Sequence, residues 1–75
     1  MSPRMRRMTA REVESLLTQH GFTMLSQSGS HRKWRNSNTR RQVIVPMHSG
    51  RQLPLGTLRN ILENSAIPPA EWMES

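Results

Sequence analysis

Residues 22–46 read FTMLSQSGSHRKWRNSNTRRQVIVP, and this stretch decides the fold. Three segments in it favour extended backbone, namely Phe22–Gln27, His31–Arg35 and Arg41–Pro46. Two clusters of turn residues, Ser28–Ser30 and Asn36–Thr39, separate these segments. Strands joined by such short connections pair with their neighbours in sequence and run antiparallel to them. The stretch therefore predicts a three-stranded antiparallel meander.

A helix is predicted on each side of this meander. Residues 9–12, TARE, form a capping box, in which a threonine hydroxyl and a glutamate carboxylate each bond the other residue's backbone amide. The box predicts a helix over Ala10–His20. After the third strand, Pro54 suits the first turn of a second helix, which is expected to end near Asn64. The apolar stripe of this second helix consists of Leu55, Leu58, Ile61 and Leu62.

The sequence predicts one small domain. A chain of 75 residues holds a single thin hydrophobic core. We expect residues 9–75 to form an α+β domain in the order α-β-β-β-α, with both helices on one face of the sheet and the other face open. Residues 68–73 suit one more helical turn that starts at proline. Residues 1–8, MSPRMRRM, lack periodicity and are predicted to form a flexible basic arm.

The charge of the chain favours a polyanionic partner. The formal net charge is +6 and the pI is about 11.8. No carboxylate occurs between Ser15 and Leu62, whereas seven cationic side chains do. A surface that only kept a protein soluble would mix both signs. The distribution therefore favours contact with the phosphates of a nucleic acid.

Composition also excludes several classes of protein. The chain has no cysteine, which rules out disulfides and thiolate metal sites. It has no apolar run long enough for a membrane-spanning helix or a signal-peptide core. The spacing of His20, His31 and His48 matches no zinc motif, so no metal site is expected. We expect a cytoplasmic protein that contacts no membrane and uses no small-molecule cofactor.

The second strand is where chemistry is expected. Successive side chains of a strand point to opposite faces of the sheet. Trp34 is the largest apolar residue of this strand and should face the helices, so that Lys33 and Arg35 lie with His31 on the open face. Arg32 shares the parity of Trp34 and is therefore expected either to sit at the margin of the sheet or to snorkel.

Histidine exchanges protons near neutral pH, and neighbouring cations attract phosphate. The run Ser28–Arg35 therefore indicates either a phosphodiester-cleaving site or a nucleic-acid-binding face, and an ordinary surface histidine is the alternative. His48 should leave the sheet at the same end as His31. Two histidines there would divide acid and base roles, although a loop histidine without chemistry fits the sequence equally well.

Several of these pieces, in this order, resemble the HicA toxin family. They are Gly21-Phe22 after the first helix, Gly29-Ser30-His31 at the start of the second strand, Val45-Pro46-Met47-His48 at the end of the third, and Gly56-Thr57-Leu58-Arg59-Asn60-Ile61-Leu62 in the second helix. The resemblance runs from about Thr9 to Ile67. The arginine-rich N-terminal segment is extra, and Trp34 stands where a tyrosine or another apolar residue is common in the family.

The resemblance implies a fold similar to the double-stranded RNA-binding domain and an endonuclease that cleaves mRNA and arrests translation and growth. It also implies a cognate HicB-type antitoxin that covers the active site, with His31 as the catalytic histidine. We expect this residue to act as general acid or base without a metal. The residues expected to contact RNA are Ser30, Lys33, Arg35, Arg41 and His48.

Two rival functions would use the same residues to bind a nucleic acid without cleaving it. One is a small RNA-binding module, which would bind RNA and leave it intact. The other is a DNA-binding adaptor, for which the second helix offers only Arg59 as a cation to read a major groove.

Overall fold

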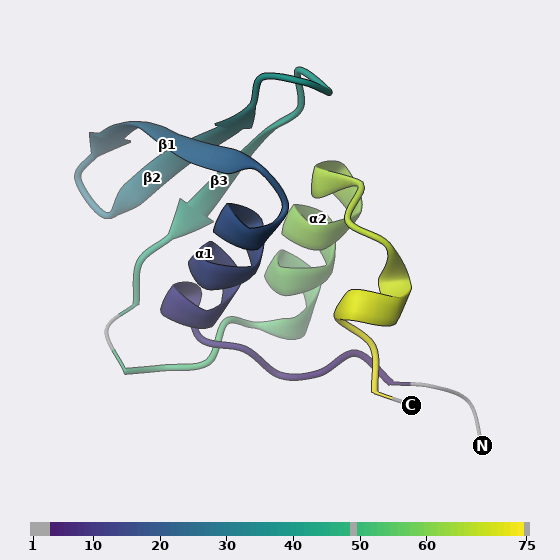
Figure 1. Cartoon of the computed structure of the whole chain (residues 1–75). Coiled ribbons are helices and arrows are strands. Elements are labelled where there is room, and N and C mark those ends of the chain that lie inside the picture. The colour runs from purple at the N-terminus through teal and green to yellow at the C-terminus, as the bar shows by residue number, and fades with distance from the viewer. Residues whose placement is uncertain (1–3, 49, 75) are drawn as a thin grey trace.

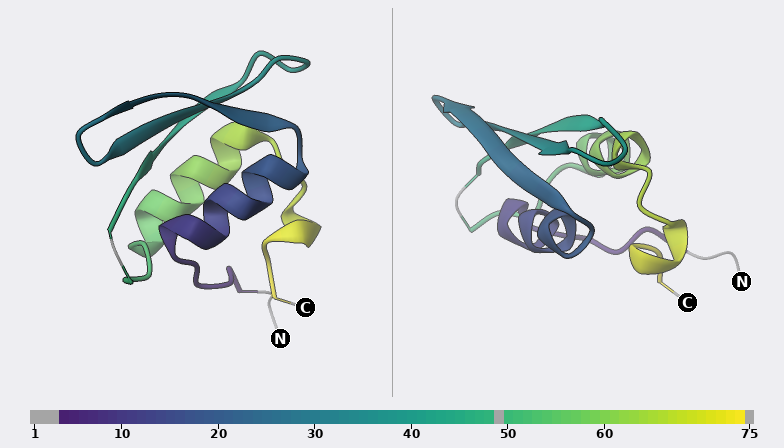
Figure 2. Two further views of the ribbon diagram at one scale, coloured as in Figure 1. Left: turned by 60° about the vertical axis from the view of Figure 1, so that its left-hand side comes forward. Right: turned by 45° about the horizontal axis from the view of Figure 1, so that its top comes forward.

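The computed structural model describes residues 4–48 and 50–74 and confirms the predicted α+β order. A three-stranded antiparallel sheet with strand order β1-β2-β3 lies against two helices (Figure 1). The elements are α1 (Ala10–Gln19), β1 (Phe22–Ser28), β2 (His31–Asn36), β3 (Gln42–Pro46), α2 (Leu55–Ser65) and a short 3-10 helix η1 (Pro69–Glu71). Both helices cover the same face of the sheet, and the opposite face carries no helix (Figure 2).

The core lies between the two helices and one face of β2 and β3. Trp34, Val43 and Val45 point from the sheet into this core, and all three are buried. The helices contribute apolar side chains to this core, including the fully buried Leu17 and Leu58. Of the stripe predicted for α2, Leu58, Ile61 and Leu62 are buried, whereas Leu55 is 41% exposed. No helix in the described part of the chain is long and apolar enough to cross a membrane.

The capping box at the start of α1 is confirmed. The backbone N–H of Thr9 donates to Glu12 Oε1 at 2.8 Å, and the backbone N–H of Glu12 donates to the Thr9 hydroxyl at 3.2 Å. The hydrogen bond that the Glu12 carboxylate accepts from the Thr9 backbone, and next the nearby Thr9 hydroxyl, hold the pKa of Glu12 below its usual value. Because the folded-state pKa is lowered, the cap stabilises the helix above the unfolded-state pKa and loses this effect as the pH falls through the folded-state pKa.

The tip of the β1–β2 hairpin projects beyond the helices (Figure 2). Phe22 is the one residue of β1 that is buried. The register shifts between Met24 and Ser26, so Leu25 is an extra residue that bulges from the ladder. The hairpin turns through Gly29 and Ser30, where Gly29 has φ +58°, and a positive φ at the first of two turn residues is typical of a type II′ turn.

For residues 4–8 the structure corrects the prediction of a flexible basic arm. Met8 is 2% exposed and belongs to the core, and its carbonyl accepts the backbone N–H of Leu53 at 2.8 Å. Met5 forms a bridge with Met73 and the backbone N–H of Arg6 donates to the carbonyl of Trp72, so residues 4–6 run beside the C-terminal segment (Figures 1 and 2). The apolar side chains of this segment are too few to show a period, and its partners are far away in sequence. Residues 1–3 lie outside the described residues.

We expect Met8→Ala to lower the free energy of unfolding by about 2–5 kcal/mol, because it empties a site in the core. Met24→Ala is the matched control, since Met24 is 49% exposed and its truncation should cost no more than about 0.5 kcal/mol. Urea denaturation of both variants measures the difference. Equal midpoints would show that residues 4–8 do not pack on the domain in solution.

Candidate active site

The candidate site lies on the open face of β2, and the alternation predicted for this strand is confirmed. His31, Lys33 and Arg35 are exposed, whereas Trp34 and Asn36 are buried and Arg32 is half-buried. β2 is the central strand, so its backbone is paired on both sides. His31 lies opposite Ser28 of β1 and Pro46 of β3.

Backbone pairing with the neighbouring segment also extends to the residue that precedes β2. The carbonyl of Ser30 accepts the backbone N–H of Met47 at 2.6 Å, which continues the pairing past the end of β3. The backbone around His31 is therefore held by both neighbouring segments, while its imidazole stays open to solvent. An exposed ring on a rigid strand is well placed for repeated proton transfer with a bound substrate.

The inward-facing residues of β2 share one carboxylate. Arg32 Nη1 donates to Glu14 Oε1 at 3.0 Å, and Trp34 Nε1 donates to Glu14 Oε2 at 2.9 Å. Glu14 comes from α1, and its side chain is only 11% exposed. Both oxygens of one helix carboxylate thus bind the residues on either side of Lys33. Because Arg32 and Trp34 are bound to α1 through Glu14, the opposite face of β2, which carries His31, points away from the helices.

Glu14 is the residue beside the candidate site whose burial and contacts the sequence did not reveal. It follows Val13 on α1, at the border of the apolar stripe, and nothing local shows that it is buried. The sequence feature that could have predicted a buried carboxylate is Arg32. Its position in the strand directs this cation toward the helices, where it needs an anionic partner. Among the described residues, Arg32 Nε is buried without an acceptor, so the pairing of this guanidinium is incomplete.

Electrostatics distinguish the two faces of β2. Within residues 4–48 and 50–74 the ion pairs are Arg32–Glu14 and His20–Glu71, and neither involves Lys33 or Arg35. The charges of these two side chains therefore face solvent beside His31 without being neutralised. Lys33 also lines a hollow of about 400 Å³ between β3 and α2. A phosphate that approaches this face meets cations with no competing carboxylate.

Arg41 was predicted to contact RNA, but the structure places it away from His31. The backbone carbonyl of Arg41 accepts the N–H of Asn36, at the opposite end of β2. Its Nη1 donates to the carbonyl of Asn64 near the C-terminal end of α2, at 3.3 Å. A guanidinium there complements the negative end of the helix dipole. This placement gives the side chain a structural contact.

His48 follows β3 at the end of the sheet where His31 begins β2, as predicted. It lines a hollow of about 450 Å³ together with Arg11 and Arg32. Arg32 belongs to the helix-facing side of the sheet, so the hollow that His48 lines opens on that side.

Taken together, the geometry defines a small basic α+β domain that presents one histidine among unneutralised cations on an open sheet. The sequence model of HicA toxins of bacterial toxin–antitoxin systems matches residues 10–67. This match spans most of the chain, so the chain belongs to the HicA toxin family. Membership makes it the toxin of a type II toxin–antitoxin system and implies a cognate antitoxin partner. A search of curated proteins found no significant match.

The contact between Glu14 and Trp34 should be measurable as a coupling. A double-mutant cycle with Glu14→Ala and Trp34→Phe should give a coupling free energy of about 1–3 kcal/mol, because the indole loses a carboxylate acceptor in a buried setting. The control cycle pairs Glu14→Ala with Trp72→Phe, since Trp72 Nε1 donates to the carbonyl of Ile67 instead. Additive effects in both cycles would argue against the shared carboxylate.

Proposed function

We propose that the protein is a metal-independent endoribonuclease that cleaves mRNA, with His31 as general acid or base. The observation that supports this proposal is the exposure of His31 on the central strand, on the same face as Lys33 and Arg35. A proton-transfer group and two phosphate-binding cations are what cleavage of RNA requires from a protein. Cleavage of cellular mRNA would inhibit translation and growth, as expected of a toxin.

RNA supplies its own nucleophile, the 2′-hydroxyl, so this reaction needs no metal-bound water. The 2′-oxygen forms a bond to phosphorus, and the bond from phosphorus to the 5′-oxygen breaks. His31 as general base takes the proton of the 2′-hydroxyl, and water supplies the proton that the 5′-oxygen receives. Acting in the other role, protonated His31 would donate to the 5′-oxygen, and water would take the proton that the 2′-hydroxyl loses. The products are a 2′,3′-cyclic phosphate and a 5′-hydroxyl.

Lys33 and Arg35 would bind the phosphate and offset the charge that develops on its oxygens. Their side chains follow His31 along the same face of one strand, at the spacing of alternate residues. Ser30 is exposed beside His31 in the hairpin turn, where its hydroxyl could donate to the same phosphate. We retain these three residues as RNA contacts and assign no such role to Arg41 or His48.

The antitoxin partner is proposed to be of the HicB type and to cover the open face of the sheet. A protein with acidic groups on its contact surface would neutralise Lys33 and Arg35 and exclude RNA from His31. Ile44 is 53% exposed on this face and offers an apolar contact between the charges.

Purified protein should cleave RNA in the presence of a chelator, and His31→Ala should slow cleavage by about 10²–10⁴-fold, the usual contribution of a general acid or base. His20→Ala is the histidine control, because His20 caps α1 and contacts Glu71 at 3.3 Å. Product ends are identified by their 2′,3′-cyclic phosphate. Equal rates for the native protein and His31→Ala would refute the assignment. RNA that is bound but stays intact would favour the non-catalytic binding module.

Lys33→Gln and Arg41→Gln each remove one positive charge, the first beside His31 and the second at the opposite end of the sheet. Lys33→Gln should weaken RNA binding and reduce the slope of log Kd against log salt by about one. Arg41→Gln should change both quantities much less, because this residue lies at the other end of the sheet. Binding is measured with His31→Ala protein at several salt concentrations. The reverse ranking would place the RNA on a different surface.

A further inference from the structure

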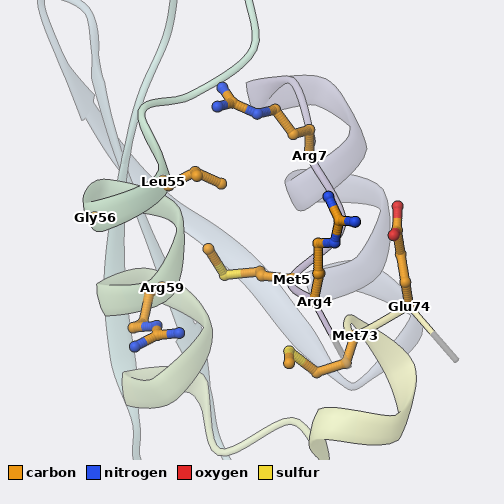
Figure 3. A pocket seen from close by; sticks show the side chains of 8 residues that line it. All are labelled: Arg4, Met5, Arg7, Leu55, Gly56, Arg59, Met73 and Glu74. Carbon is orange, nitrogen blue, oxygen red and sulfur yellow. The ribbon is translucent and has the colours of Figure 1, made fainter. Parts of the chain in front are cut away.

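A second candidate binding surface lies on the helix side of the domain, away from the open face of the sheet. It is a hollow of about 660 Å³ between residues 4–7, the start of α2 and the C-terminal segment. In Figure 3 the side chains of Met5, Leu55 and Met73 converge on the middle of this hollow. Arg4, Arg7 and Arg59 surround them.

The middle of the hollow suits an aliphatic side chain. Leu55 is 41% exposed although it belongs to the apolar stripe of α2, and both methionines are only partly buried. Among the described residues that line the hollow, none is aromatic, so it offers no ring on which a nucleobase would stack. Methionine side chains adapt to varied apolar partners and are common at binding surfaces.

The rim of the hollow suits carboxylates. Within the described residues, Arg4, Arg7 and Arg59 form no ion pair with a carboxylate. Glu74, the one acidic residue of the lining, extends on the far side of Arg4 from α2 (Figure 3). Leu55 and Gly56 begin α2, so the positive end of the helix dipole adds to the potential of the three guanidinium groups.

We propose that this hollow docks an acidic, amphipathic peptide segment of a partner protein. One aliphatic side chain of the segment lies between Met5, Leu55 and Met73, and flanking carboxylates bind the three arginines. Four of these six residues (Arg4, Met5, Arg7 and Met73) fall outside the family match over residues 10–67. The docking surface is thus built largely by segments that this chain adds to the family domain, and a partner held there leaves His31 uncovered.

The test uses full-length protein carrying His31→Ala and a phage-displayed library of random dodecapeptides. Selected peptides should share an aliphatic residue flanked by aspartate or glutamate. A synthetic copy is then titrated into protein labelled with ¹³C at the methionine methyl groups. Binding should shift the resonances of Met5 and Met73 and leave that of Met24, on exposed β1, unchanged.

Arg4→Gln combined with Arg7→Gln should raise the Kd of the peptide about tenfold, because two exposed ion pairs are lost. Arg40→Gln combined with Arg41→Gln is the matched control, because both residues lie in the β2–β3 connection and the pair of substitutions also removes two positive charges. Circular dichroism checks that the variants stay folded. Selection that yields no acidic–aliphatic pattern, or shifts at Met24 in place of Met5 and Met73, overturns the proposal. So does a single-stranded RNA that shifts the two pocket methionines when the peptide does not.

Discussion

The carboxylate of Glu14 is the contact on which the arrangement of the candidate site depends. It binds Arg32 with one oxygen and Trp34 with the other, from a helix that precedes both in sequence. A partly buried ion pair of this kind contributes little net stability, because desolvation offsets the attraction. Its larger effect is on specificity. A shift of β2 by one residue would turn Arg32 and Trp34 toward solvent and leave Glu14 buried without partners.

This contact gives the two faces of β2 different chemical characters. The even-numbered side chains of the strand are bound or buried, and the odd-numbered ones are exposed and carry the unneutralised charge. An imidazole on the helix side would be desolvated and would compete with Trp34 for the carboxylate. On the open side it can reach a large polymer such as RNA without any rearrangement of the core. The open face of the sheet also leaves room for a protein partner to cover it.

Sequence patterns were sufficient where structure is determined locally. The capping box, the turn residues and the single tryptophan of β2 predicted the elements and the exposed face, because each depends on near neighbours or on parity. The burial of Glu14 and Met8 and the contact of Arg41 with α2 were not predicted. Their environments come from partners distant in sequence: Arg32 and Trp34 for Glu14, Leu53 for Met8, and Asn64 for Arg41. Arg41 was predicted as an RNA contact from its charge, and no local pattern indicated its hydrogen bond to the end of α2.

The most direct test of the account follows two side chains of β2 that face opposite ways. The ligand is an RNA oligonucleotide with 2′-deoxy substitutions, which lacks the nucleophile and stays intact. In NMR spectra recorded during its titration, we expect the ring resonances of His31 to shift and the indole N–H of Trp34 to stay unchanged. Shifts at the Trp34 indole with an unaffected His31 ring would contradict the account, because RNA would then meet the opposite face of the strand.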